Sequence, residues 1–563
     1  MTLQNCQYTN HQGKQNCTHP VWASSEKNFC IFHDAAKTKP EAEFNELLRK
    51  KINSRDFNFE GFIFTFSVNF RDVVFQEFAN FENCQFLGRE SSFYKTSFLK
   101  GAIFNQALFQ GMKTNFSKAQ FQGDFNLFNA CRFESHESHF NEANFHGKHV
   151  SFANSHFKGE QLDFRASQFQ GSVFFTQTEL HSIHSSFEKI RYSGPMISFA
   201  NSSMSGNEIK FTEMDWAGEQ IIFSDCNIKN DHVHFDLTHF KASKIQFSNV
   251  FFQCHSLTFL QCDFEFDQLS FANSTFSAKE TNFSNTVFKK GRADFSSAQF
   301  KSKILKFYPL TLENPTTNFS RTEFSGDEKV IYILNPKKND LSFQEVFFHG
   351  GRSKLKGDLH AASFLDTSLD NVDLNEAHWD TLHGRLTCRD EMDANRVKSQ
   401  AHYKKASDVC RNIKKCYENF GSYETAGNFY YGEMECKRKL SPRKSWGGLQ
   451  FMRLSTGYGE YPVRVIFTSL FFIAFCSFFY LIGGVDTGSG IINRDLRLDL
   501  SQTYSTVMDF LHCFYFSVVS FTTLGYGDYH PVGWSRVIGA SEGFIGAFFI
   551  SMFVLTIGRK MNR

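Results

Sequence analysis

The sequence has little proline and almost no net charge. It contains 9 Pro among 563 residues, and 60 Lys and Arg face 58 Asp and Glu, which leaves a formal charge of +2. Such a balance argues against a basic nucleic-acid-binding protein and against a disordered polyelectrolyte. We therefore expect no nucleic-acid partner.

A secretory signal and a disulfide framework are also lacking. Residues 1–10 do not show the basic and then apolar pattern of a signal peptide, and the 14 Cys are spread without dense, even spacing. We therefore expect most of the chain to be cytosolic, with reduced thiols.

Phenylalanine, by contrast, is in large excess, with 72 residues. From Phe175 to Phe307 a Phe recurs every twelve residues, and a second apolar residue follows each of them five positions later. An earlier run keeps this spacing from Phe104 to Phe169. A period of twelve fits neither a helix nor a coiled coil, whereas a β-solenoid stacks each ring on the next. We expect these Phe to fill the core of a solenoid.

The repeat then tightens. A small residue usually stands two positions before the second Phe of a unit, and after residue 359 the apolar residues are five apart: Leu359, Phe364, Leu369, Leu374 and Trp379. Here the sequence resembles the pentapeptide-repeat family. The resemblance implies a right-handed quadrilateral β-helix over 57–380, with coils of either 20 residues or, from two twelve-residue units, 24.

The two ends of such a solenoid expose unpaired strand edges, which need caps. Residues 1–50 and the helices expected after 385 are placed to supply them. The polar faces or the ends of the solenoid are then the places where a cytoplasmic protein partner would bind.

Three cysteines and a histidine near the N-terminus have the composition of a structural zinc site, which would stabilise a zinc-knuckle-like segment over 1–50 that is too short to bury its own core. His11 and His19 are alternative ligands, and unrelated reduced cysteines are the alternative interpretation. The predicted zinc ligands are Cys6, Cys17, Cys30 and His33.

Residues 385–445 leave the five-residue rule and become rich in Glu, Lys, Arg and Ala, with apolar positions at helical spacing. Gly421 and Ser422 interrupt the pattern, which predicts an α-helical hairpin as a cytoplasmic linker. A plain connector and a ligand-sensing site both fit this composition.

The last hundred residues contain two apolar runs long enough to cross a membrane. Val465–Ile482 is uncharged, and Val537–Ile557 contains one acid, Glu542. We expect membrane helices over 463–483 and 536–558. Neither carries regularly spaced Arg, so a voltage sensor is not expected.

Basic residues predict the orientation. Lys and Arg gather before the first span and after the second, whereas the connecting loop has only Arg494 and Arg497. The positive-inside rule therefore places both termini in the cytoplasm of a multi-pass protein of the cell (inner) membrane.

Between the spans, the apolar stretch 507–521 is too short to cross and suits a re-entrant pore helix. It leads directly into 522–528, Thr-Thr-Leu-Gly-Tyr-Gly-Asp. This heptapeptide resembles the selectivity filter of potassium channels, and the resemblance covers 461–563. It implies that four subunits supply rings of carbonyl oxygens that replace the hydration shell of K⁺. A similar segment, Thr456–Glu460, has no half-helix before it and is assigned to the turn before the first span.

The resemblance also assigns roles to single residues. Asp528 lies at the outer mouth, and because Val519 stands where many relatives have a Glu partner for it, Asp528 must find a different partner. Gly525 and Gly527 permit the unusual backbone dihedrals of a filter. The ion-binding residues are Thr522, Thr523, Leu524, Gly525, Tyr526 and Gly527.

Two residues of the second span are candidates for gating. Glu542 is expected to face protein or water rather than lipid, in a structural role behind the filter or in gating. Gly546 matches the position where related inner helices bend, although small residues there also serve close helix packing.

These features predict a multi-domain, homotetrameric potassium channel in a lipid bilayer, with an α-helical two-span pore and a β-helix of structural, gating or partner-binding role. K⁺ is then the transported ion. The alternative is a membrane-tethered scaffold with a non-conducting or non-selective pore. An enzyme is not expected, because His and Ser occupy repeat positions without a convergent nucleophile and base.

Overall fold

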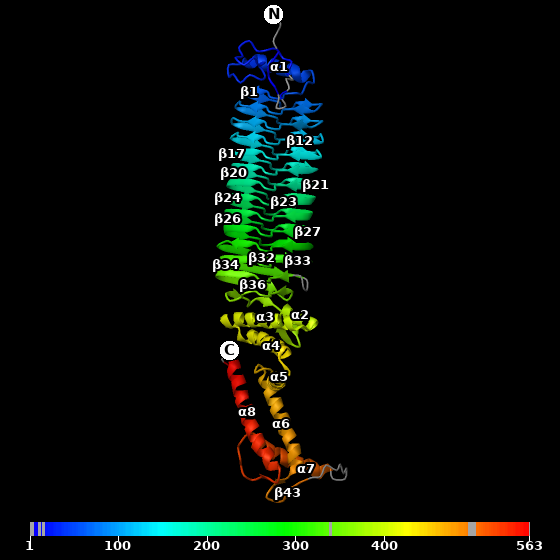
Figure 1. Ribbon diagram of the computed structural model, residues 1–563, viewed down its shortest axis with the longest axis vertical. Coiled ribbons are helices and arrows are strands. Elements are labelled where there is room, and N and C mark those ends of the chain that lie inside the picture. Colours follow the sequence, from blue (N-terminus) through cyan, green and yellow to red (C-terminus); the bar gives the residue numbers. More distant parts are fainter. Residues whose placement is uncertain (1–4, 10–12, 14–16, 337–340, 494–502, 562–563) are drawn as a thin grey trace. The chain divides into compact units, whose positions relative to one another are not determined.

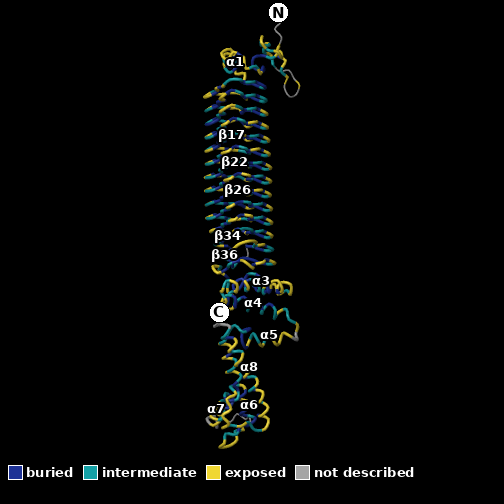
Figure 2. The backbone as a smooth tube through the Cα atoms, turned by 90° about the vertical axis from the view of Figure 1, so that its left-hand side faces the viewer, coloured by how far each residue is buried: buried dark blue, intermediate teal, exposed yellow. Residues whose placement is uncertain are grey.

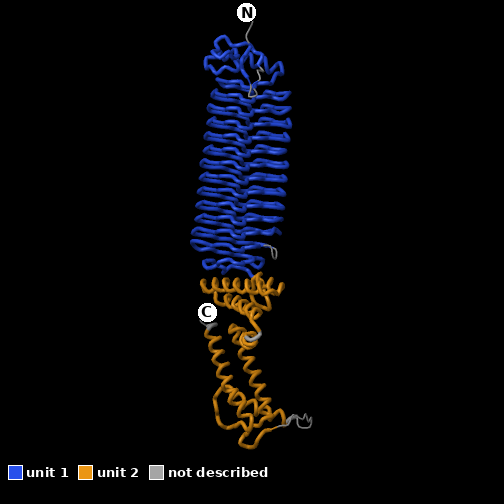
Figure 3. Tube along the Cα trace, in the orientation of Figure 1, with its two compact units in different colours: residues 1–379 blue, residues 380–563 orange. Residues whose placement is uncertain are grey.

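The chain folds into two compact units, Met1–Trp379 and Asp380–Arg563 (Figure 3). The first unit is a parallel β-solenoid that begins after one helix, α1 (Glu41–Asn53), and the second is mainly helical. The computed structural model describes residues 5–9, 13, 17–336, 341–493 and 503–561.

The solenoid changes its strand length along the chain (Figure 1). Its first strands, β1 (Ile63–Phe64) to β16 (His149–Ser151), have two or three residues, and four of them make one coil, since β1 pairs with β5 (Gln85–Phe86). Longer strands then cover two sides each: β17 pairs with both β13 (Arg132–Phe133) and β14 (Glu137–His139). The eight-residue strands are β17 (His156–Asp163), β20 (Glu179–Ser186), β21 (Arg191–Ser198), β22 (Ser203–Lys210), β23 (Asp215–Ile222), β24 (Asn227–His234), β25 (His239–Gln246), β26 (Phe251–Thr258), β27 (Asp263–Ser270) and β28 (Thr275–Asn282).

The strand register gives the size of the coil. In the middle of the solenoid paired residues are 24 positions apart, as in Tyr192 opposite Trp216. Near the end of the solenoid, Gly357 of β36 (Phe347–Asp358) lies opposite Ala377, so this coil has 20 residues. The sequence left 20 and 24 open, and the fold uses both.

The twelve-residue Phe period produces two columns of stacked rings. Phe199 stacks on Phe223 with 4.8 Å between ring centroids, and Phe211 of the other column stacks on Phe235 at 5.0 Å. Across the core, Phe199 and Phe211 meet edge to face, 5.7 Å apart with an interplanar angle of 84°. All four are buried. The prediction of a Phe-filled solenoid is confirmed, and Figure 2 shows buried and exposed residues alternating along each coil.

The small residue of each unit has a function that the sequence did not indicate. The Sγ–H of Cys226 donates a hydrogen bond to the carbonyl of Phe199, and the hydroxyl of Thr238 donates one to the carbonyl of Phe211, at 2.9 and 2.7 Å. Each bond joins a coil to the preceding one. Only a short side chain fits at this corner.

The N-terminal segment covers the first coil. Phe32 stacks on Phe62 at 4.3 Å, and the carbonyl of Phe32 accepts a hydrogen bond from the backbone N–H of Ile63 at 2.8 Å. Phe44 of α1 is buried against Phe64, with 5.6 Å between centroids. This arrangement protects the first strand edge, as expected for a cap.

The second unit begins with a short hairpin and continues as helices. The break at Gly421 and Ser422 separates two packed helices of the linker, as the sequence indicated. Its elements are β40 (Asp380–Leu382), β41 (Arg385–Thr387), α2 (Arg389–Val397), α3 (Gln400–Asn419), α4 (Tyr423–Leu440), α5 (Arg443–Ser455), α6 (Pro462–Gly483), β42 (Val485–Asp486), β43 (Ile491–Ile492), α7 (Thr503–Phe521), β44 (His530–Pro531) and α8 (Ser535–Met561).

Two helices of the described residues are long and apolar enough to cross a membrane, α6 and the Ser535–Gly558 part of α8. The two expected spans fall on them. Arg494 and Arg497, which contributed to the predicted orientation, lie outside the residues that the structure describes.

Candidate functional site

Three apolar helices enclose the candidate site. The C-terminal half of α6 packs on α7 through Cys476, Tyr480, Cys513 and Phe516, all buried. A second cluster joins α6, the end of α7 and α8. The predicted pore helix is therefore held on one side by both predicted spans.

The chain that follows α7 has an unusual backbone. Every second residue of this stretch is left-handed: φ is +57° at Thr523, +59° at Gly525 and +77° at Gly527. A non-glycine residue rarely adopts such a φ, and glycine adopts it freely. The alternation is what aiming successive carbonyls to one side requires. Leu524 and Tyr526, between these positions, are exposed in the single chain.

Asp528 has the different partner that the sequence called for. Its carboxylate accepts a hydrogen bond of 2.7 Å from the hydroxyl of Tyr515 on α7. Tyr515 lies one helical turn before Val519, on the same face, and it also meets Tyr529 edge to face at 5.2 Å. The sequence signal for Tyr515 was this spacing from Val519.

Glu542 is fully buried and joins three helices. Its carboxylate accepts a hydrogen bond of 2.5 Å from the hydroxyl of Tyr480 on α6 and another from the hydroxyl of Ser517 on α7. A buried carboxylate needs such donors. Glu542 therefore faces protein and connects α8 to the pore helix from behind.

With this geometry in place, the chain can be compared with known proteins. Residues 465–563 match the protein-family model described as an ion channel. This match covers α6, α7 and α8 and none of the solenoid. Searches among curated proteins and among solved structures found no match. The second unit thus contains an ion channel domain.

Gly546 of the ion channel domain is placed where no side chain fits. A Cβ built there would lie 2.0 Å from the carbonyl oxygen of Phe521, the last residue of α7. At Gly539 and Gly543 the nearest atom lies at least 3.5 Å away. The geometry gives Gly546 a role in close packing of α8 on the end of the pore helix.

The filter-like segment Thr456–Glu460 lies in the turn between α5 and α6, as expected. Tyr458 is buried there, and its hydroxyl donates a hydrogen bond of 2.8 Å to Glu435 of α4. This turn therefore anchors the first membrane helix to the linker.

We expect Glu542→Ala to destabilise the ion channel domain by about 1–3 kcal/mol, because two buried hydroxyls lose their acceptor. The melting temperature of the protein in detergent measures this. Ser551→Ala is the matched control, since Ser551 is exposed on α8 and its hydroxyl donates to Ala547 of the same helix. Equal melting of the two variants would contradict the structural role of Glu542.

A Cys and His cluster that could hold a metal ion lies in the first unit. The sulfur atoms of Cys17 and Cys30 are 3.8 Å apart, and Nδ1 of His33 lies 3.6 Å from the sulfur of Cys6 and 3.2 Å from that of Cys30. These are the four predicted ligands. Hydrogen bonds from Cys17 and Cys30 lower the pKa of Cys6, which favours the thiolate that binds metals.

The surroundings orient the histidine of this cluster. Nε2 of His33 donates a hydrogen bond of 2.9 Å to the carbonyl of Glu60, so Nδ1 is left to face the three sulfur atoms. The ring of Tyr8 stacks on His33 with 4.0 Å between centroids. His19 has its ring against Phe32 and is not a member of the cluster, whereas His11 lies outside the described residues.

Proposed function

We propose that the protein is a potassium-selective channel, without a voltage sensor, whose pore is formed by four copies of the chain. The observation that carries the proposal is the alternating backbone of Thr523, Gly525 and Gly527, directly after the pore helix of an ion channel domain. Rings of carbonyls from four such segments would coordinate a dehydrated K⁺, whose preferred ligands are oxygen atoms.

Exposed side chains support the assembly of several copies. Leu524 and Tyr526 of the filter segment are 60% and 67% exposed in one chain, and Phe544 of α8 is 81% exposed. Apolar groups of this size are normally covered by protein or by lipid. In the proposed tetramer the filter segments face one another, and the solenoid and both termini lie in the cytoplasm.

Potassium flux from the purified full-length protein in liposomes tests the proposal. Flux that is selective for K⁺ over Na⁺ and blocked by Ba²⁺ is expected, together with a native mass of four chains in detergent. Empty liposomes are the control. If the reconstituted protein gives no selective flux, the membrane-tethered scaffold is the better interpretation.

We also propose that the Cys and His cluster holds a structural zinc ion. A tetrahedral site with Zn–S of about 2.3 Å and Zn–N of about 2.0 Å places its sulfur atoms roughly 3.8 Å apart and sulfur and nitrogen roughly 3.5 Å apart. The separations in the cluster are close to these values. Zinc would fix the N-terminal segment on the first coil.

Removal of the ligand Cys30 tests the zinc. We expect about one zinc per chain in the native protein and none in Cys30→Ala, with residues 17–56 becoming sensitive to protease because the cap loses its cross-link. Cys254→Ala, a solenoid cysteine outside the cluster, is the control and should keep both zinc and resistance. A native protein without zinc would rule the site out.

A further inference from the structure

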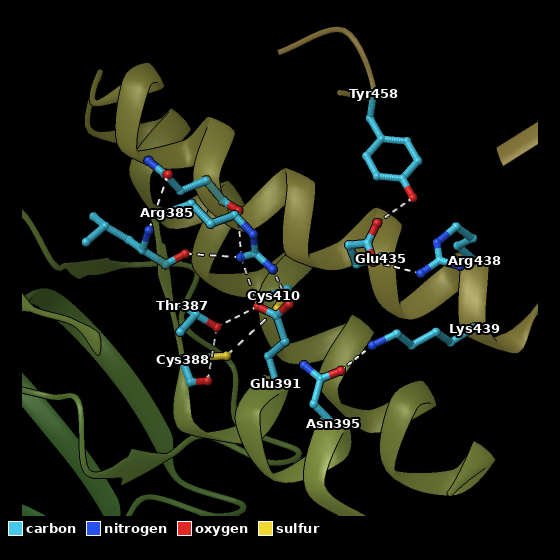
Figure 4. Close-up of polar contacts among 12 residues, drawn as sticks. Arg385, Thr387, Cys388, Glu391, Asn395, Cys410, Glu435, Arg438, Lys439 and Tyr458 are labelled. Carbon is cyan, nitrogen blue, oxygen red and sulfur yellow. Dashed lines mark hydrogen bonds and ion pairs between the residues drawn. The ribbon is translucent and has the colours of Figure 1, made fainter. Parts of the chain in front are cut away.

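The linker and the start of the first membrane helix enclose a basic cavity of about 740 Å³. The hairpin after Asp380, α2, α4, α5 and α6 all contribute to its wall, and Figure 4 shows part of it. Its lining has five Lys and Arg side chains against two carboxylates, an excess of three positive charges. These cations are Arg385, Arg438, Lys439, Arg453 and Arg464.

Three of the five cations are paired. Arg385 makes a two-armed ion pair with Glu391, one arm at 3.0 Å, and both side chains are buried. Glu435 is shared by Arg438 at 3.0 Å and Arg453 at 3.1 Å. The two carboxylates of the cavity are therefore occupied and fixed in place.

The remaining two cations have no carboxylate partner among the described residues. Lys439 donates to the amide oxygen of Asn395 and lies over the ring of Tyr403 at 5.0 Å (Figure 4). Arg464 lies over Tyr461 at 4.6 Å and donates a long hydrogen bond of 3.4 Å to a backbone carbonyl. Burial lowers the pKa of Lys439, as expected for an amine that has lost water without gaining an anion.

The chemistry of this cavity fits one class of ligand. An Arg and a Lys held beside each other without counter-ions favour a compact anion with several acceptor oxygens, and phosphate has this geometry. We propose that the cavity binds a phosphate monoester group, held by Lys439 and Arg464.

Such a group has two sources, a soluble phosphate ester and the head group of an anionic phospholipid. Arg464 and the exposed Phe467 lie in the first turns of α6, the predicted membrane helix, and Leu454 of α5 adds a second exposed apolar side chain to the cavity wall. A lipid could therefore place its phosphate at Arg464 and its chains along Phe467. Either ligand would fix the start of α6 relative to α4.

Direct binding to the purified full-length protein tests this site. The probes are fluorescent phosphatidate in neutral detergent and radiolabelled inorganic phosphate in equilibrium dialysis. Binding of phosphatidate alone would identify a lipid site, and binding of inorganic phosphate would identify a soluble ligand. If neither probe binds, the proposal is overturned.

Variants place the bound phosphate in the cavity. The double variant Lys439→Gln, Arg464→Gln should weaken binding by about tenfold for each charge removed, whereas Lys439→Arg, Arg464→Lys should stay near the native affinity. Lys404→Gln, an exposed position of α3 outside the cavity, is the matched control. Native affinity in the double Gln variant would contradict the assignment.

The binding measurement does not depend on ion conduction. If phosphate binds but no K⁺ flux is found, the cavity stands and the proposed channel function fails. If K⁺ flux is found and neither probe binds, the reverse holds.

Discussion

Replacement of Gly525 by Ala is expected to abolish K⁺-selective flux and to leave the solenoid folded. Gly525 has φ of +59°, which costs an alanine about 1–2 kcal/mol. The backbone relieves this strain by rotating, which turns the adjacent carbonyls away from the ion path. In a tetramer the change occurs four times around one pore. The ratio of K⁺ to Na⁺ flux in liposomes measures it.

A matched control exists in the same unit. Gly488, in the loop after α6, has φ of +74°, and a Cβ at either Gly488 or Gly525 would meet no atom within 4 Å. Gly488→Ala therefore carries similar backbone strain outside the filter segment, and its flux should be native. Unchanged K⁺ selectivity in Gly525→Ala would show that this segment is not the filter.

Replacement of Phe223 by Ala is expected to destabilise the solenoid by about 3–5 kcal/mol. The ring is buried between Phe199 and Phe247, at 4.8 and 4.9 Å, and meets the edges of Phe211 and Phe235. Its removal leaves a cavity in the column that neighbouring rings cannot fill. Hydrogen exchange should increase in the coils on both sides, since each coil depends on its neighbours.

The control for this variant is Phe251→Ala. Phe251 begins β26 in the same solenoid and is 39% exposed, so its loss should have a much smaller effect on exchange and on the melting temperature. Equal effects of the two substitutions would mean that the ring columns do not stabilise the fold.

Much of this architecture could be predicted from the sequence because its signals are local and repeated. A Phe every twelve residues leaves few alternatives to a solenoid, and the uncharged run from Val465 to Ile482 indicates a membrane helix by length alone. The heptapeptide at 522–528 belongs to the same class of signal, because its glycines are adjacent in the chain.

Other features depend on side chains that only the folded chain brings together. The partner of Asp528 is Tyr515, thirteen residues earlier, and the contact requires the chain to turn back on α7. Lys439 and Arg464 line one cavity because α5 and the turn around Tyr458 lie between them. No spacing rule connects such residues, so the cavity had no sequence signal.

The 24-residue register of the middle coils also makes the solenoid modular. Each ring there stacks on the ring 24 positions away, and each corner side chain bonds to the coil before it. Deletion or duplication of 24 residues between equivalent positions would give every remaining ring the same neighbours as before. Gene duplication can therefore lengthen or shorten this unit in whole layers, and no residue of the core has to change.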